Sequence, residues 1–227
     1  MREASKTNLV RPLDFSKKYL SGRVLDIGAG GDLVCTWAES FDVDKGDANT
    51  IDKYFEPETF DSIHSSHCLE HMINPVSALA GWWSILKRGG FLILVVPDED
   101  LYEQTIWPSA FNSDHKSTFR LDKPTSWSLL SYELRSMCEN LPNSEIVSAE
   151  IQDSNYDHSL RFPSGIAYKK RKPLHVKWSL SVAKRIPIVG WRAKRFLQRR
   201  LVKHGFAVDQ TAGDALAQIQ IIVRKMA

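Results

Sequence analysis

Apolar and polar residues form two kinds of pattern along this chain. Short, continuously apolar runs such as FLILVVP at residues 91–97 are typical of parallel strands covered on both faces. The strands predicted from such runs and from alternation are residues 23–27, 41–43, 60–64, 91–97, 146–151 and 217–225. The helices predicted between them are residues 13–20, 32–40, 75–87 and 127–141. This order predicts an α/β fold with a doubly wound, mostly parallel sheet.

A different pattern begins after the fifth of these strands. No acidic residue occurs between Asp157 and Asp209, although that segment carries fourteen Lys or Arg. Residues 174–185 and 191–204 are predicted to be amphipathic basic helices, separated by the breaker IPIVG. We therefore divide the chain into a core of residues 1–152, a basic helical insertion or lid of residues 153–215, and a final core strand within residues 216–227.

Charge and composition narrow the partners and the compartment. The net charge of the chain is +3. Outside the basic segment, however, there are only 16 Lys or Arg and 27 acidic residues, so only the basic segment suits an anionic partner. No stretch approaches the roughly 18 apolar residues of a membrane span, and the N-terminal MREASKTNLVRPLDF has no apolar signal segment. We expect a cytoplasmic protein. Cys35, Cys68 and Cys138 are far apart, so we expect buried thiols and no metal site.

The sequence RVLDIGAGGD at residues 23–32 ends the first strand in a glycine-rich turn, where open parallel sheets bind their ligands. A dinucleotide fingerprint requires a third glycine where this chain has Leu33, and Asp32 would repel a pyrophosphate. The P-loop pattern is also absent. The turn is therefore suited to a ligand without phosphates.

Three blocks of sequence resemble the class I S-adenosylmethionine-dependent methyltransferases. VLDIGAGGD resembles their motif I, FDSIHSSHCLEHMINP resembles the strand-four region of the type-11 members, and ALAGWWSILKRGGFLILVVPDEDLY is similar to their following helix and strand five. Together the blocks cover about residues 20 to 105. The resemblance implies a Rossmann-like fold with an antiparallel final strand, and S-adenosylmethionine as the cofactor.

The resemblance also implies a role for individual residues. The residues implied to line the amino-acid part of the cofactor are Asp26, Gly28 and Gly30. Those implied for the nucleoside are Asp42 for the ribose, with Asp44 as a rival, and Asp47 and Ala48 for the adenine. Those implied to flank the methionine and the sulfonium are Ser65, Ser66 and His67. A cationic sulfonium and ammonium favour a turn that carries carboxylates.

Methyl transfer to a hydroxyl usually needs a general base beside the cofactor. The candidates near the strand ends are His67 and His71 in SSHCLEH, Glu99 and Glu103 in PDEDLYE, and Asp114 and His115 in the polar loop PSAFNSDHKSTF. Histidine titrates near neutrality and therefore suits this role. For His71 we favour a structural or cofactor-positioning role.

The acceptor is suggested by residues 97–119, which resemble a methyltransferase subgroup often encoded with cell-surface polysaccharide genes. That likeness implies O-methylation of a saccharide or another small hydroxyl acceptor, which would include lipid-linked glycans. The alternatives are an RNA methyltransferase and a non-catalytic binding protein with the same fold. The basic residues within 168–204 fit peripheral contact with an anionic inner-membrane surface, with RNA as the less favoured partner and a merely solvated lid as the third reading.

Overall fold

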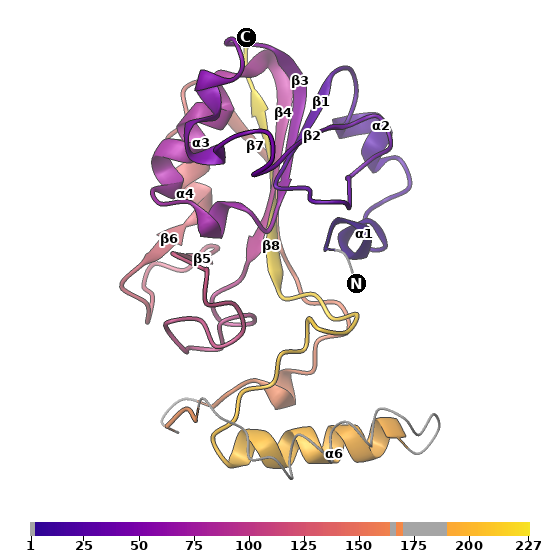
Figure 1. Ribbon diagram of the computed structural model, residues 1–227, viewed down its shortest axis with the longest axis vertical. Helices are drawn as coiled ribbons and strands as arrows, with labels where there is room; N and C mark the ends of the chain where they lie inside the picture. Colours follow the sequence, from indigo (N-terminus) through magenta and orange to yellow (C-terminus); the bar gives the residue numbers. More distant parts are fainter. Residues whose placement is uncertain (1–2, 164–166, 170–189) are drawn as a thin grey trace.

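The computed structural model describes residues 3–163, 167–169 and 190–227. Its main sheet has the strand order β2-β1-β3-β4-β8-β7 (Figure 1). The strands are β1 (Val24–Ile27), β2 (Glu39–Phe41), β3 (Phe60–Ser66), β4 (Leu86–Pro97), β7 (Ser144–Gln152) and β8 (Gln218–Lys225). Strands β1 to β4 are parallel, and β8 is antiparallel to both of its neighbours. The predicted Rossmann-like α/β fold with an antiparallel final strand is confirmed.

Helices cover both faces of this sheet. On one face lie α3 (Pro75–Ser84) and α4 (Leu134–Glu139), and on the other α1 (Glu3–Asn8) and α2 (Phe15–Tyr19) (Figure 1). Three short 3-10 turns occur at η1 (Ala48–Lys53), η2 (Leu69–His71) and η3 (His158–Leu160). A small second sheet pairs β5 (Thr118–Arg120) with β6 (Ser131–Glu133).

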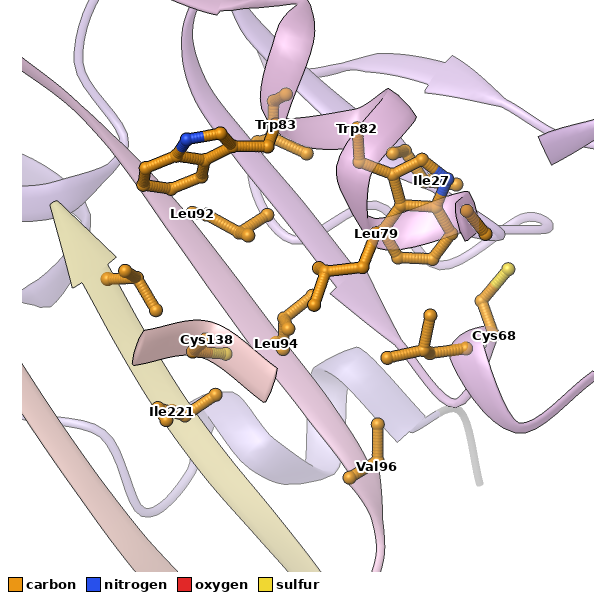
Figure 2. Packing of buried hydrophobic residues seen from close by; sticks show 14 of the residues in the cluster. Ile27, Cys68, Leu79, Trp82, Trp83, Leu92, Leu94, Val96, Cys138 and Ile221 are labelled. Atoms are coloured by element: carbon orange, nitrogen blue, oxygen red, sulfur yellow. The ribbon is translucent and has the colours of Figure 1, made fainter. Parts of the chain in front are cut away.

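The main hydrophobic core lies between the sheet and α3. Trp82, Trp83 and Leu79 of α3 pack over Leu92 and Leu94 of β4 (Figure 2). The intervening Ile93 points to the opposite face, where it packs with the α2 cluster. Because residues 92–97 of β4 are buried on both faces, this part of the strand is a continuous apolar run, as predicted.

The helix predicted over residues 32–40 is wrong. Residues 32–38 form turns and bends, and Glu39 already begins β2. Val34 and Cys35 are buried against α2 and the sheet, while the Val34 amide donates to the Asp26 carboxylate at 2.7 Å. The β-branched and aromatic residues of this segment have low helix propensity. The seven residues between the glycine turn and β2 instead pack on the α2 face of the sheet as they connect β1 to β2.

The helix predicted over residues 127–141 is shorter than expected. Only Leu134–Glu139 is helical, because the preceding residues are held by acidic side chains at the end of β4. The Ser126 hydroxyl donates to Glu99 at 2.7 Å, and the Trp127 indole donates to Asp100 at 3.1 Å. Residues 131–133 then form β6 instead of a helical turn.

The second predicted basic helix is present as α6 (Gly190–Lys203), and the first, residues 174–185, lies outside the described residues. In Figure 1, α6 lies apart from the main sheet, on the side of the carboxyl ends of the parallel strands. Leu201 and Val202 pack against the segment that follows, and Arg195 pairs with Asp157 at 2.6 Å. Among the described residues, no helix has the length and apolarity needed to span a membrane.

Candidate functional site

Two adjoining cavities lie at the carboxyl ends of β1, β2 and β3. The larger has a volume of about 660 Å³ and the smaller about 360 Å³. Gly28, directly after β1, and His67, directly after β3, line both of them. The strand order reverses at β1, so the cavities occupy the switch point where open α/β sheets bind ligands.

The glycine turn forms the boundary between the two cavities. Gly28 has a φ of +73° and Gly30 a φ of +54°, the left-handed region that favours glycine. A Cβ added to Gly28 would lie 2.6 Å from the Cβ of Cys68, which therefore sets a steric limit at this position. Burial raises the pKa of the Cys68 thiol to about 12, so this thiol stays protonated and closes the wall as an apolar group.

Asp26 lies in the wall of the smaller cavity, and its carboxylate is held by the protein. Asp26 is buried; one carboxylate oxygen accepts from the Val34 amide at 2.7 Å and the other lies 2.7 Å from His64 Nδ1. Burial lowers the pKa of His64, so the neutral ring donates from Nδ1 to Asp26 and accepts at Nε2 from Arg11, 3.2 Å away. Asp26 thus fixes the shape of the glycine turn.

Asp42 connects the end of β2 to the glycine turn and lines the larger cavity. Its two carboxylate oxygens accept from the amides of Gly30 and Val43, each at 2.7 Å. Each oxygen retains a second lone pair with which to accept from a ligand hydroxyl. Asp44, its rival for that role, lies outside the described walls of both cavities.

Asp47 and Ala48 also line the larger cavity. Asp47 caps η1 by accepting from the Asn49 amide at 2.9 Å, and the hydrogen bond from the Asn49 side chain holds the pKa of Asp47 below its usual range. The buried Trp82 indole donates to the Ala48 carbonyl at 2.8 Å. The core of the domain therefore supports this wall of the cavity directly.

The three residues predicted beside the sulfonium separate into two groups. Ser66 and His67 line the smaller cavity, and the Ser66 hydroxyl is buried without a hydrogen-bond partner among the described residues. Ser65 is buried outside both cavity walls and donates to the Ile27 carbonyl at 3.1 Å. Ser65 therefore joins β3 to β1 instead of facing a ligand.

The predicted base candidates also separate. Asp114 is exposed and lines the larger cavity, where His67 also lies. His115 is buried behind the described cavity wall, with its Nδ1 atom 2.6 Å from Glu103. The expectation that His115 faces an acceptor in the cavity is therefore not met.

The sequence reasoning missed a buried cluster beside these candidates. Glu70, which is 1% exposed, lies on η2 directly before His71. Its Oε1 atom lies 3.5 Å from His67 Nδ1, 3.8 Å from His115 Nε2 and 4.0 Å from His71 Nε2. The grouping of two histidines and a glutamate within SSHCLEH, directly after a buried strand, was the available signal.

Comparisons with known proteins bear on the family and the fold of this chain. A family model described as "Methyltransferase domain" matches residues 4–211. A solved structure of a SAM-dependent methyltransferase from Archaeoglobus fulgidus is 16% identical, with 99% of this chain and 95% of that chain covered and a TM-score of 0.50. The YcgJ protein from Bacillus subtilis is 13% identical, with 98% and 99% covered and a TM-score of 0.51. At these identities the structures show a common fold. A search of the curated proteins found no match.

Proposed function

The chain belongs to the methyltransferase family, and we propose that it transfers a methyl group from S-adenosylmethionine to a hydroxyl of a saccharide or another small acceptor. The observation that carries the proposal is the pair of cavities that meet at Gly28 and His67. Two neighbouring cavities that share wall residues suit a donor with a nucleoside at one end and an amino acid at the other.

The residues of the smaller cavity fit the cationic end of this donor. Glu3, Asp26 and Asp32 contribute carboxylates to its wall, which suit an ammonium and a sulfonium. The orphaned hydroxyl of Ser66 provides a buried donor and acceptor that would be satisfied by the amino-acid part. We propose that Asp26, Gly28, Gly30, Ser66 and His67 hold this part of the cofactor.

The residues of the larger cavity fit the nucleoside end. The free lone pairs of Asp42 would accept from the ribose hydroxyls, and Asp47 and Ala48 would contact the adenine. Asp42 is favoured over Asp44 because it lines the cavity and is fixed by two backbone amides.

The chemistry needs an acceptor oxygen in line with the methyl group and a group that takes its proton. Bound S-adenosylmethionine supplies an electrophilic methyl on sulfur, which leaves as a thioether with the electron pair of the broken C–S bond. His67 lies where the two cavities meet, and its Nε2 is 3.0 Å from Gln218 Oε1, an atom that only accepts. Nε2 therefore carries a proton, and Nδ1 lies 3.5 Å from Glu70 Oε1. Although burial opposes it, Glu70 raises the pKa of His67, so that Nδ1 takes up a proton readily. Asp114, which also lines the larger cavity, is the second candidate for the group that takes the proton.

Calorimetry with S-adenosylmethionine tests the donor site. We expect Asp42→Ala to weaken binding at least about tenfold, because charge-assisted hydrogen bonds contribute roughly 1.5–3 kcal/mol each. Asp44→Ala is the matched control, since Asp44 is an exposed carboxylate on the same loop. If only Asp44→Ala weakens binding, the assignment of the ribose site is wrong. A folded wild-type chain that gives no binding would support a non-catalytic role.

A methyl-transfer screen with labelled cofactor tests the acceptor. The substrates are nucleotide sugars, lipid-linked glycans and RNA, and we expect label in a saccharide fraction. Label recovered in RNA alone would overturn the proposed acceptor class and support the RNA alternative.

We further propose that the enzyme reaches a lipid-linked acceptor at an anionic membrane surface through α6. This helix lies on the side of the sheet where the cavities are found (Figure 1) and exposes Phe196, Arg200 and Lys203. Each Lys or Arg near anionic lipid contributes about 1 kcal/mol. In liposome sedimentation with anionic vesicles, Arg200→Glu with Lys203→Glu should reduce binding. The same reversal at Lys17 and Lys18 of α2, which are also exposed, should not; equal binding by all three proteins would refute the idea.

A further inference from the structure

A carboxylate and two imidazoles are clustered at the wall of the larger cavity. One oxygen of Glu70 and one ring nitrogen each of His71 and His115 lie within 4.8 Å of one another. Glu70 and His71 are adjacent on η2, whereas His115 comes from the loop before β5. The loop is fixed there because the Lys116 amide donates to the Glu70 carbonyl at 2.8 Å.

Both histidines are oriented by a second carboxylate. His71 Nδ1 lies 2.9 Å from Asp114 Oδ2, and His115 Nδ1 lies 2.6 Å from Glu103 Oε1. Each carboxylate holds the Nδ1 proton of its ring, so the Nε2 lone pair points to the side of Glu70. A carboxylate that binds the outer nitrogen of a histidine is the usual support of a metal-ligating imidazole.

The centre of this cluster is a buried carboxylate, from which the nearest basic atom outside the cluster, His67 Nδ1, lies 3.5 Å away. Glu70 is 1% exposed, and both of its carboxylate oxygens are buried without a hydrogen-bond donor among the described residues. A buried carboxylate left in this way carries a large desolvation penalty. With both Nε2 atoms presenting lone pairs, a cation between the three side chains satisfies all of them.

We propose that Glu70, His71 and His115 bind one divalent transition-metal ion, such as Zn²⁺, Mn²⁺ or Fe²⁺. Two imidazoles and one carboxylate suit these ions, whereas Mg²⁺ and Ca²⁺ prefer oxygen ligands. The Glu70–histidine distances of 3.8 and 4.0 Å exceed the roughly 3–3.4 Å between ligand atoms around a bound ion of this size, so the side chains need to move inward only slightly.

Three protein ligands leave open positions on the ion. His71 and Asp114 both line the larger cavity, so these positions face that cavity, which in this proposal receives the acceptor as well as the nucleoside. This part of the proposal rests on the proposed function: the ion binds the acceptor hydroxyl and promotes loss of its proton. The O–H bond breaks with the proton passing to His67 Nδ1, the oxygen forms the new C–O bond to the methyl, and the C–S electron pair stays on sulfur.

Metal binding is measured directly on the full chain without a histidine tag. After chelator treatment, we expect titration calorimetry to give one site for Zn²⁺ or Mn²⁺ and much weaker binding of Mg²⁺. Glu70→Gln should lower the affinity by more than tenfold, and Glu103→Gln, which alters only the support of His115, by about 10- to 100-fold. His158→Ala is the control, because His158 is paired with Asp153 outside the cluster and should bind metal as the wild type does.

Circular dichroism and thermal melting distinguish loss of the site from loss of the fold. Added metal should raise the Tm of the wild type and of His158→Ala but not that of Glu70→Gln. A wild type that is folded, binds S-adenosylmethionine and takes up no metal would overturn the metal site while leaving the donor site intact. One-to-one metal binding without any affinity for S-adenosylmethionine would overturn the proposed function and leave the metal site standing. Equal affinities for Glu70→Gln and His158→Ala would refute the ligand assignment.

Discussion

Asp98, directly after the carboxyl end of β4, provides a test of how the burial of a carboxyl group affects the free energy of unfolding. Asp98 is 5% exposed, and its Oδ1 accepts from the amides of Asp100 and Leu101, each at 2.9 Å. Burial, with Asp100 and Glu99 as nearby like charges, raises the pKa of this carboxyl from 3.8 to about 6. Because the hydrogen bonds from the two amides do not offset the burial and the nearby negative charges, the ionised form is disfavoured in the folded state.

The sign and size of the effect follow from this shift. A carboxyl whose folded pKa lies above its unfolded value loses stabilisation as the pH rises from about 4 to about 6, and the loss is complete above that range. Two pKa units correspond to about 3 kcal/mol. The substitution Asp98→Asn keeps the acceptor oxygen for both amides and cannot ionise. We therefore expect the free energy of unfolding of this variant to exceed that of the wild type by up to about 3 kcal/mol at pH 7, and by little at pH 4.

Urea unfolding curves of both proteins between pH 4 and 8 measure this difference. Asp122→Asn is a control of opposite sign, because the hydrogen bond from Arg135 holds the pKa of Asp122 below its usual range. Its stabilisation is present above the unfolded pKa and is lost as the pH falls, so the variant should be the less stable protein at pH 7. An Asp98→Asn difference that is independent of pH, or that favours the wild type at pH 7, would refute the reasoning.

Two further substitutions test the link between the fold and the donor site. Gly28→Ala should abolish S-adenosylmethionine binding in calorimetry, because its Cβ would lie 2.6 Å from Cys68, whereas Gly89→Ala, with a φ of +80° and no atom within 4 Å, should lose only about 1–2 kcal/mol of stability in urea and bind normally. Trp82→Phe removes the hydrogen bond to the Ala48 carbonyl, so it should lower the free energy of unfolding by about 1–3 kcal/mol and weaken cofactor binding several-fold. Unchanged affinity for the cofactor would contradict a supporting role for this indole.

The strands could be predicted because burial on both faces leaves a local trace in the sequence. FLILVVP is continuously apolar since Leu92 and Leu94 face the α3 side and Ile93 faces the α2 side. The positions of Gly28 and Gly30 could be predicted for a similar reason. A turn that needs positive φ directly after a buried strand can be identified without knowledge of distant residues.

The helix predicted over residues 32–40 is absent and the one over 127–141 is shortened, because in both segments side chains make contacts with other parts of the chain. Residues 32–38 are held by Asp26, eight positions before Val34, and by burial of Val34 and Cys35 against the more distant α2. Residues 126 and 127 are held by Glu99 and Asp100, more than twenty positions earlier. Weak helix propensity in both segments was overridden by these tertiary contacts.

The acceptor side of the site depends on long-range contacts more strongly than the donor side does. The donor residues follow the ends of β1, β2 and β3, and parallel strands bring such ends to one edge whatever the loops do. Glu70 and His115 are 45 positions apart and meet only because the loop after β4 returns to pair with the Glu70 carbonyl. Glu103 and Asp114, which orient the histidines, belong to that same returning loop. Changes in this loop would therefore alter the metal ligands and the acceptor wall together, while the cofactor edge of the sheet stays as it is.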